Sequence, residues 1–192
     1  MTGLLDRPGH RPAGAGPPTD LPATEAIPGV HLRPAGAADS PAVRAFLCGL
    51  SLDSAYRRFF TGLGSVPDSL VRRLLATGAT RTVVLAVAGG EIVGVADTTV
   101  VDGGAAVELG IVVADSWQRR GLGWPLADAA LAPARAGGIS TLRAHTLPDN
   151  ARVARMLRRR WPAARSRFED GTLIWDIGLT GPAARVPDQS QR

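Results

Sequence analysis

The chain has 192 residues, of which 45% are hydrophobic, and this length is enough for one domain with a sizeable core. A single cysteine, Cys48, excludes an internal disulfide framework and a cysteine-rich zinc site. No apolar run is long enough to cross a bilayer, and the opening sequence MTGLLDRPGHRP lacks the apolar segment of a secretory signal. We therefore expect a cytoplasmic protein that does not bind a membrane.

The formal net charge is +5, and all 22 basic residues are arginine. Arginine keeps its charge over the whole accessible pH range, so a basic chain does not need a concentrated basic surface. The 17 acidic residues are interspersed, and we do not expect nucleic acid as a partner. The densest run, RVARMLRRR at 152–160, is interpreted as a solvated helix face. As the alternative, it is a patch that binds anions, either cofactor phosphates or nucleic acid.

Composition divides the chain into three segments. Residues 1–28 are rich in Pro, Gly and Ala and cannot bury enough surface to offset their ordering entropy, which predicts a flexible tail. Residues 181–192 have a similar composition, which predicts a second flexible tail. Residues 29–180 are expected to form the domain between the two tails.

The domain begins with a predicted strand at 30–33, followed by three helices. Asp39 or Ser40 can cap the first helix, because Pro41 then lies in the first turn, where a missing N–H has no cost. Apolar residues at helical spacing predict the other two helices at 54–60 and 68–76.

After the third helix the hydrophobic period changes from helical to alternating. The remaining elements are predicted as strands at 82–88, 91–100 and 106–113, a helix at 123–136, a strand at 141–147, a helix capped by Asp149 and running to about 160, and a hairpin that turns at Asp170-Gly171. This order predicts a mixed α+β architecture with a mostly antiparallel sheet. The helix at 123–136 permits the strands on either side of it to pair in parallel.

The segment 107–136 is the most informative part of the sequence. Its buried strand ends at Val113, and the motif QRRGLG at 118–123 then leads into an apolar helix. Glycine lets the backbone approach a ligand closely, the N–H groups at a helix start attract anions, and adjacent arginines add charge-assisted bonds. The turn therefore suits a pyrophosphate. It is not a P-loop, since no Lys-Ser or Lys-Thr follows, and its glycine spacing differs from the dinucleotide fingerprint.

The QRRGLG motif resembles the acetyl-CoA signature Gln/Arg-x-x-Gly-x-Gly/Ala of the GNAT N-acetyltransferase superfamily. The sequence LSLDSAYRRFF at 50–60 resembles the "LS..S.Y.RFF" helix of one branch of that superfamily. This branch holds the bacterial protein lysine acetyltransferases and the acetyltransferase modules attached to acyl-CoA synthetases. Further matches, within a resemblance that covers roughly residues 30 to 180, lie at Leu32-Arg33-Pro34 with Asp39, Val93-Gly94-Val95-Ala96, Val107-Glu108 and Leu147-Pro148-Asp149-Asn150.

The resemblance implies the GNAT fold, in which helices cover both faces of a central, mostly antiparallel mixed sheet with one splayed parallel strand pair. It also implies acetyl-CoA as co-substrate, with the pyrophosphate on the loop N–H groups and the pantetheine arm along the preceding strand. The residues so implied to bind the cofactor are Ile111, Val112, Val113, Gln118, Arg119, Arg120, Gly121, Leu122, Gly123, Trp124 and Asn150. For Asn150 a role as helix cap is an equal alternative. No spacing of histidines and carboxylates suggests a metal site.

Acetyl transfer to an alkylammonium requires a base, because such a group has a pKa near 10.4. Glu108, an isolated charge in an apolar strand, matches the glutamate that serves as base in the lysine acetyltransferase branch. The alternative is a glutamate on a solvated sheet face or paired with an arginine. His145, on the predicted strand at 141–147, lies near the expected acetyl position but is interpreted as a satisfied histidine on a core strand. We assign no general acid, since the one tyrosine, Tyr56, is far upstream of the last helix, where the superfamily often carries one.

Two residues depart from the superfamily pattern within the loop. Trp124 is bulkier than the small residue common there, and Pro125 removes one N–H that could meet a phosphate. Both bear on how tightly the loop holds its cofactor.

The leading hypothesis is a protein lysine acetyltransferase, for example one that acts on an acyl-CoA synthetase. The alternatives are acetylation of a small amine, a CoA-binding sensor or scaffold without catalysis, and a basic nucleic-acid-binding protein.

Overall fold

The computed structural model describes residues 24–62 and 64–179. Its strands are β1 (Thr24–Ile27), β2 (Val30–Pro34), β3 (Arg81–Ala88), β4 (Glu91–Val101), β5 (Ala106–Val113), β6 (Thr141–Thr146), β7 (Arg165–Glu169) and β8 (Thr172–Gly178). Its α-helices are α1 (Ser40–Cys48), α2 (Leu52–Phe59), α3 (Asp68–Leu75), α4 (Gly123–Ala136) and α5 (Ala151–Arg160). Short 3-10 helices lie at η1 (Ala37–Asp39), η2 (Asp102–Gly104) and η3 (Asp115–Trp117).

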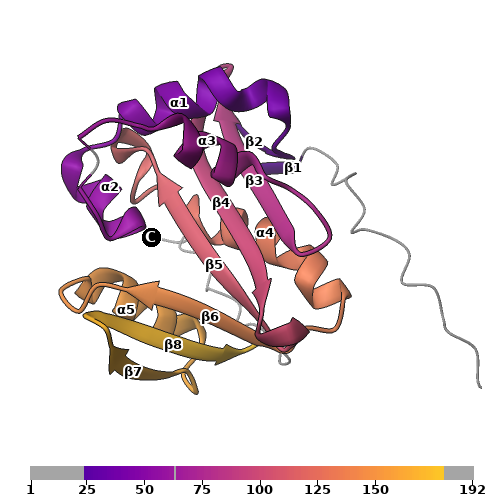
Figure 1. Ribbon diagram of the computed structural model, residues 1–192, viewed down its shortest axis with the longest axis vertical. Helices are drawn as coiled ribbons and strands as arrows, with labels where there is room; N and C mark the ends of the chain where they lie inside the picture. Colours follow the sequence, from indigo (N-terminus) through magenta and orange to yellow (C-terminus); the bar gives the residue numbers. More distant parts are fainter. Residues whose placement is uncertain (1–23, 63, 180–192) are drawn as a thin grey trace, which may run out of the picture.

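The eight described strands form one sheet in the order β1-β2-β3-β4-β5-β6-β8-β7 (Figure 1). Every neighbouring pair is antiparallel except β5 and β6, which are parallel and joined by α4. The prediction of a mostly antiparallel mixed sheet with one parallel pair is thus confirmed.

The parallel pair is short and then opens. Its three paired positions are Ala106 with Thr141, Val107 with Leu142, and Glu108 with Arg143. Beyond Glu108 the two strands diverge, although β5 continues for five more residues and stays paired with β4 on its other edge (Figure 1). The predicted splay therefore begins at Glu108, and it leaves one edge of β5 without a neighbouring strand.

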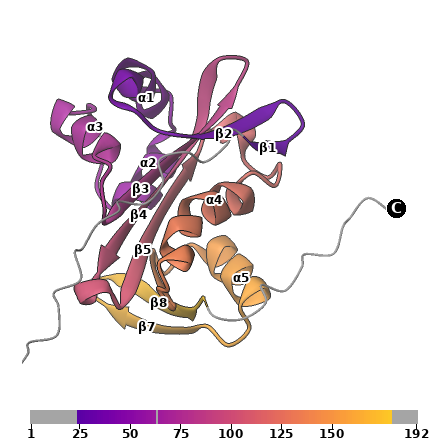
Figure 2. The same ribbon diagram turned by 90° about the vertical axis from the view of Figure 1, so that its right-hand side faces the viewer.

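Helices cover both faces of the sheet, as predicted (Figure 2). On one face α1 and α3 pack Val43, Phe46 and Leu74 against Leu85 and Val95 of the sheet. On the other face α4 and α5 cover the sheet. There α4 packs Leu126 and Ala130 against β3 and β4, and α5 packs Leu157 near Trp175 of β8. Runs of consecutive buried residues along β3 and β4 supply both cores, because successive side chains of a strand point to opposite faces of the sheet.

Most predicted elements lie within two residues of their observed bounds, and two details differ. The strand β1 lies inside the range predicted as an N-terminal tail, because Gly29, at a φ of 77°, turns the chain so that Glu25 can pair with His31. The cap of α5 is Asn150, whose side chain accepts the Val153 N–H at 3.3 Å, and Asp149 lies one residue too early. The rest of the predicted N-terminal tail, residues 1–23, and the whole of 181–192 lie outside the described residues.

None of the helices that the structure describes has the length and apolarity needed to cross a membrane.

The close packing of α4 against β4 predicts that a side chain added at Gly94 destabilises the fold. A Cβ on this residue would lie 3.1 Å from Leu126 Cδ2 and 3.4 Å from the Ala86 Cβ, in a fully packed region. Gly94→Val should therefore lower the free energy of unfolding by about 1–3 kcal/mol, measured by urea denaturation. Gly78→Val is the matched control, since nothing lies within 4 Å of a Cβ there and a change within about 0.5 kcal/mol is expected. Equal effects of the two substitutions would contradict this packing.

Candidate active site

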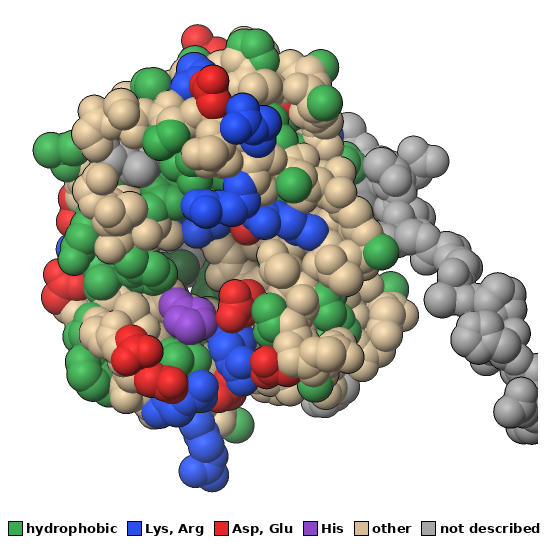
Figure 3. Space-filling model, viewed as in Figure 1, with side chains coloured by type: hydrophobic (Ala, Val, Ile, Leu, Met, Phe, Trp, Pro, Cys, Tyr) green, Lys and Arg blue, Asp and Glu red, His purple; other side chains and the backbone are tan. Residues whose placement is uncertain are grey.

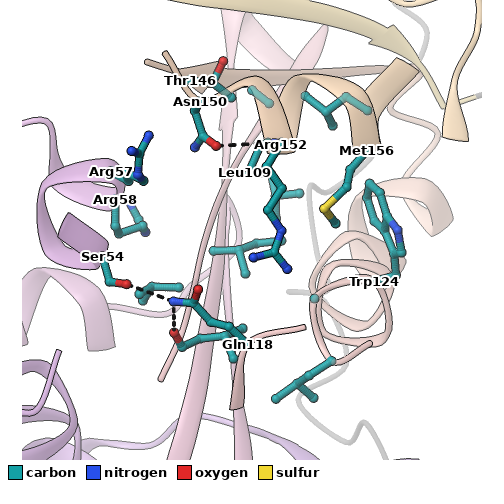
Figure 4. Close-up of a pocket in the computed structure, with 18 of the residues that line it drawn as sticks. Ser54, Arg57, Arg58, Leu109, Gln118, Trp124, Thr146, Asn150, Arg152 and Met156 are labelled. Atoms are coloured by element: carbon teal, nitrogen blue, oxygen red, sulfur yellow. Dashed lines mark hydrogen bonds between the residues drawn. The ribbon is translucent and has the colours of Figure 1, made fainter. Parts of the chain in front are cut away.

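A cleft of about 540 Å³ opens where β5 and β6 diverge. Three walls surround it: α2 on one side, the start of α5 on another, and the loop from β5 to α4 at the base (Figure 4). The unpaired edge of β5 faces it through Leu109, Ile111, Val112 and Val113. An extended ligand can therefore pair with the free backbone groups of β5 while its charged end reaches the loop.

The loop at 118–123 is shaped to accept an anion. Arg119 and Gly121 have positive φ values of 64° and 86°, so the chain folds tightly before α4 begins at Gly123. Within the described ranges, the backbone N–H groups of residues 119–122 donate no hydrogen bond. Uncommitted N–H groups at the positive end of a 14-residue helix suit a pyrophosphate.

The side chain of Gln118 braces the loop. Its amide nitrogen donates to Ser54 Oγ at 2.9 Å and to the Val113 carbonyl at 3.2 Å (Figure 4). Both donors of the amide are therefore used within the protein. Gln118 lines the cleft, but its main contact is with α2 and the end of β5.

Asp115 ties α2 to the same loop. Its carboxylate accepts the Ser51 N–H at 2.9 Å, and the hydroxyls of Ser51 and Ser54 each donate to it at 2.7 Å. Ser51 also caps α2 by accepting the Ser54 N–H. Burial raises the pKa of the Asp115 carboxyl, but these hydrogen bonds lower it by more and hold it below its usual value.

A second link holds α2 over the sheet. Arg58 of α2 and Arg81 of β3 both pair with Asp97 of β4, and all three side chains are largely buried. The Arg58 guanidinium lies where a Cβ of Gly110 would be, so only glycine at that point of β5 leaves it room. Arg58 consequently lines the cleft from the side of the free β5 edge.

Trp124 turns away from the loop and packs against the helix layer. Its ring meets Trp161 edge to face with centroids 5.4 Å apart, and the Arg160 guanidinium lies 4.9 Å from its centroid. Asp128 fixes Arg160 through two bonds of 2.8 and 2.9 Å. The indole thus forms a wall of the cleft beside Met156 (Figure 4). Although Pro125 follows, α4 still starts at Gly123.

Glu108 lies at the last paired position of β5, where the splay begins. Its carboxylate is half-exposed, and Oε1 is 3.6 Å from Nε2 of His145 on β6. His145 lines the cleft, whereas Glu108 lies just outside its lining. The side chain of His145 is partly buried and is on the sheet face opposite the buried Leu142 and Ala144.

Comparison with known proteins identifies the family. A family model described as the acetyltransferase (GNAT) family matches residues 50–160. The chain belongs to this family. It is an acetyl-CoA-dependent acetyltransferase, which confirms the class of enzyme and the co-substrate expected from the loop. A search of curated proteins finds no match.

Solved structures of the GNAT family share the fold. The GNAT domain of PAT from S. lividans has a TM-score of 0.71 and 24% identity, over 78% of this chain and 90% of that one. The ribosomal-protein-S18-alanine N-acetyltransferase from Escherichia coli has a TM-score of 0.60 and 15% identity, over 82% of this chain and 98% of that one. The PaiA N-acetyltransferase from Thermoplasma acidophilum, in complex with coenzyme A, has a TM-score of 0.58 and 12% identity, over 78% of this chain and 98% of that one.

Ten of the eleven residues predicted to bind the cofactor line the GNAT cleft. The exception is Arg120, whose guanidinium lies 4.8 Å from the ring centroid of Trp117. Asn150 lines the cleft and also caps α5, so both of its predicted roles suit its position. No group of three potential metal ligands occurs among the residues that the structure describes.

Several residues of the site have no role among the predictions from sequence. Ser51 and Ser54 belong to the motif at 50–60, but their hydrogen bonds to Asp115 join segments more than 60 positions apart. The pairing of Arg58 with Asp97 likewise has no counterpart in the predictions from sequence. For Asp97 a signal existed, since it is an isolated charge in an apolar strand, as is Glu108.

The lowered pKa of Asp115 predicts a pH-dependent contribution to stability. The folded pKa lies below the unfolded value, which is near 3.8, so the stabilisation is present above about pH 4 and disappears as pH falls through the folded pKa. Asp115→Asn should lower the free energy of unfolding by on the order of 1 kcal/mol at pH 7, and the difference from wild type should shrink below pH 4. Urea denaturation from pH 3 to 7 measures both, with Asp170→Asn in an exposed turn as control. A difference that grows as pH falls would contradict the assignment.

Proposed function

We propose that this enzyme transfers acetyl from acetyl-CoA to a primary amine, with protein lysine side chains as the leading acceptors and Glu108 as general base. Acyl-CoA synthetase-type enzymes are an example of such acceptors. The observation that carries the proposal is the place of Glu108, a half-exposed carboxylate at the point where β5 and β6 separate. The similarity to the GNAT domain of PAT supports the choice of the protein lysine acetyltransferase branch.

The loop and the free strand edge fit the two ends of the co-substrate. N–H groups of residues 119–122 would hold the pyrophosphate, and Ile111 to Val113 would pair with the pantetheine arm. This arrangement brings the thioester toward the place where β5 and β6 meet, near His145 and Glu108. The acceptor amine then approaches from the sheet face that carries both side chains.

The chemical step requires a neutral amine. Glu108 removes a proton from the alkylammonium, directly or through a water beside His145. The amine nitrogen then forms a bond to the acetyl carbon and the carbon–sulfur bond breaks. The nitrogen gives up its second proton to water, and the CoA thiolate takes up one proton from water, so that the amide and the CoA thiol leave neutral. Tyr56 does not line the cleft and takes no part in this step.

Replacement of Glu108 should separate chemistry from binding. We expect Glu108→Gln to lower kcat by about 10²-fold or more, because the amide cannot accept the proton. The Kd for acetyl-CoA should change less than about twofold, since the loop and the β5 edge are intact. Steady-state kinetics and isothermal titration calorimetry measure the two quantities.

Glu91→Gln is the matched control, because Glu91 is exposed at the start of β4 and its side chain makes no hydrogen bond or ion pair within the described residues. It should leave kcat unchanged. If Glu108→Gln retains full turnover, Glu108 is not the base.

The acceptor class can be tested directly, because the enzyme itself contains no lysine and cannot label its own side chains. Incubation with isotopically labelled acetyl-CoA and a lysate of the source organism should yield label on protein lysines, read by mass spectrometry. Label confined to protein N-termini or to small amines would overturn lysine as the acceptor while leaving acetyl transfer intact.

A further inference from the structure

Most charged side chains that line the cleft already have partners. Arg57 pairs with Asp53 at 2.8 Å and with Asp149 at 3.4 Å. Arg58 pairs with Asp97 of β4. These groups neutralise one another and leave little net charge on the α2 side.

Two arginines that line the cleft have no such partner. Arg119 in the loop and Arg152 in α5 form no ion pair or side-chain hydrogen bond with any residue in the ranges 24–62 and 64–179. They belong to different walls. Figure 4 shows Arg152 extending from α5 into the cleft, in the space between Gln118 and Trp124. Two arginines without an ion pair at one cleft favour a bound anion there, since charge-assisted hydrogen bonds to guanidinium groups are strong.

The place of Arg152 in its helix points to the same conclusion. It is the second residue of α5, and the first turn of this helix contains no acidic residue. A cation at a helix N-terminus opposes the helix dipole and is unfavourable unless an anion lies close by. A bound phosphate would offset both the dipole and the guanidinium charge.

The other arginines of the run at 152–160 have separate positions. Arg158 lies 5.0 Å from the ring centroid of Trp175, and Arg160 is held by Asp128 among the tryptophans. Arg155 is exposed and does not line the cleft. Four arginines of the run are exposed, in agreement with the predicted solvated helix face: Arg152, Arg155, Arg158 and Arg159. Arg152 is the arginine of the run that lines the cleft.

We propose that Arg152 is a second phosphate-binding residue for acetyl-CoA, facing the loop at 118–123 across the cleft. The inference rests on the proposed binding of acetyl-CoA in this cleft. The cofactor phosphates are then held between α5 and the loop before α4, and the enzyme selects CoA thioesters over thioesters that lack phosphate.

Calorimetric titration of the full chain with CoA tests this, using Arg152→Gln against the matched control Arg155→Gln. Both substitutions remove one charge from the same helix, so they alter its long-range field alike. We expect Arg152→Gln to weaken CoA binding about tenfold, the usual loss from one charge-assisted contact, and to reduce its salt dependence. Arg155→Gln should change the Kd less than twofold.

Two CoA fragments locate the contact. If Arg152 binds the 3′-phosphate, the substitution weakens CoA binding but not that of dephospho-CoA. If it binds the pyrophosphate, both lose affinity equally. Pantetheine, which lacks phosphate, should bind the variant and wild type alike. Equal effects of Arg152→Gln and Arg155→Gln on CoA, or an equal loss with pantetheine, would overturn the inference. A wild-type chain that does not bind CoA would overturn the proposed function as well.

Discussion

The site depends on one constraint, the early end of pairing between β5 and β6. Backbone N–H and C=O groups are costly to leave unpaired, so an open strand edge next to a cleft is suited to a partner that supplies complementary groups. Here pairing stops at Glu108, and the β5 edge beyond it lines the cleft. The walls keep the edge open. On one side Asp115 and Asp97 anchor α2, and on the other Leu157 and Trp161 dock α5 against the sheet.

The distribution of charge follows from the same arrangement. Arginine supplies every basic side chain, and its planar group can be tied down by carboxylates or stacked on aromatic rings. The α2 wall uses this property to hold itself in place, as Arg58 and Arg81 share Asp97. Among the arginines that line the cleft, the two without an ion pair in the described residues are Arg119 of the loop and Arg152 at the start of α5. On the face seen in Figure 3, the arginine side chains lie in several groups among carboxylates and form no single basic patch.

Sequence predicted the elements well because their signals are local. The motif QRRGLG, the glycine turns and the helical spacing of leucines fixed the strand-loop-helix unit at 106–136. Features that depend on contacts between segments distant in the sequence could not be predicted in this way. Gln118 was assigned to the cofactor, but its amide bonds Ser54, 64 positions away. The strand β1 was missed because a four-residue strand among Pro and Gly has too few apolar residues to reveal a period. The alternation along β6 places His145 on the face opposite Leu142 and Ala144. Only the tertiary structure shows that α5 covers the face of Leu142 and Ala144.

Hydrogen–deuterium exchange of the backbone, followed by mass spectrometry with and without saturating acetyl-CoA, tests the central claim most directly. The open edge of β5 and the uncommitted N–H groups of the loop predict slower exchange at 109–113 and 119–122 when acetyl-CoA is bound, with little change in β2 and β3. Unchanged exchange at 109–113 in the presence of bound acetyl-CoA would show that the splayed strand does not receive the co-substrate and would contradict the account.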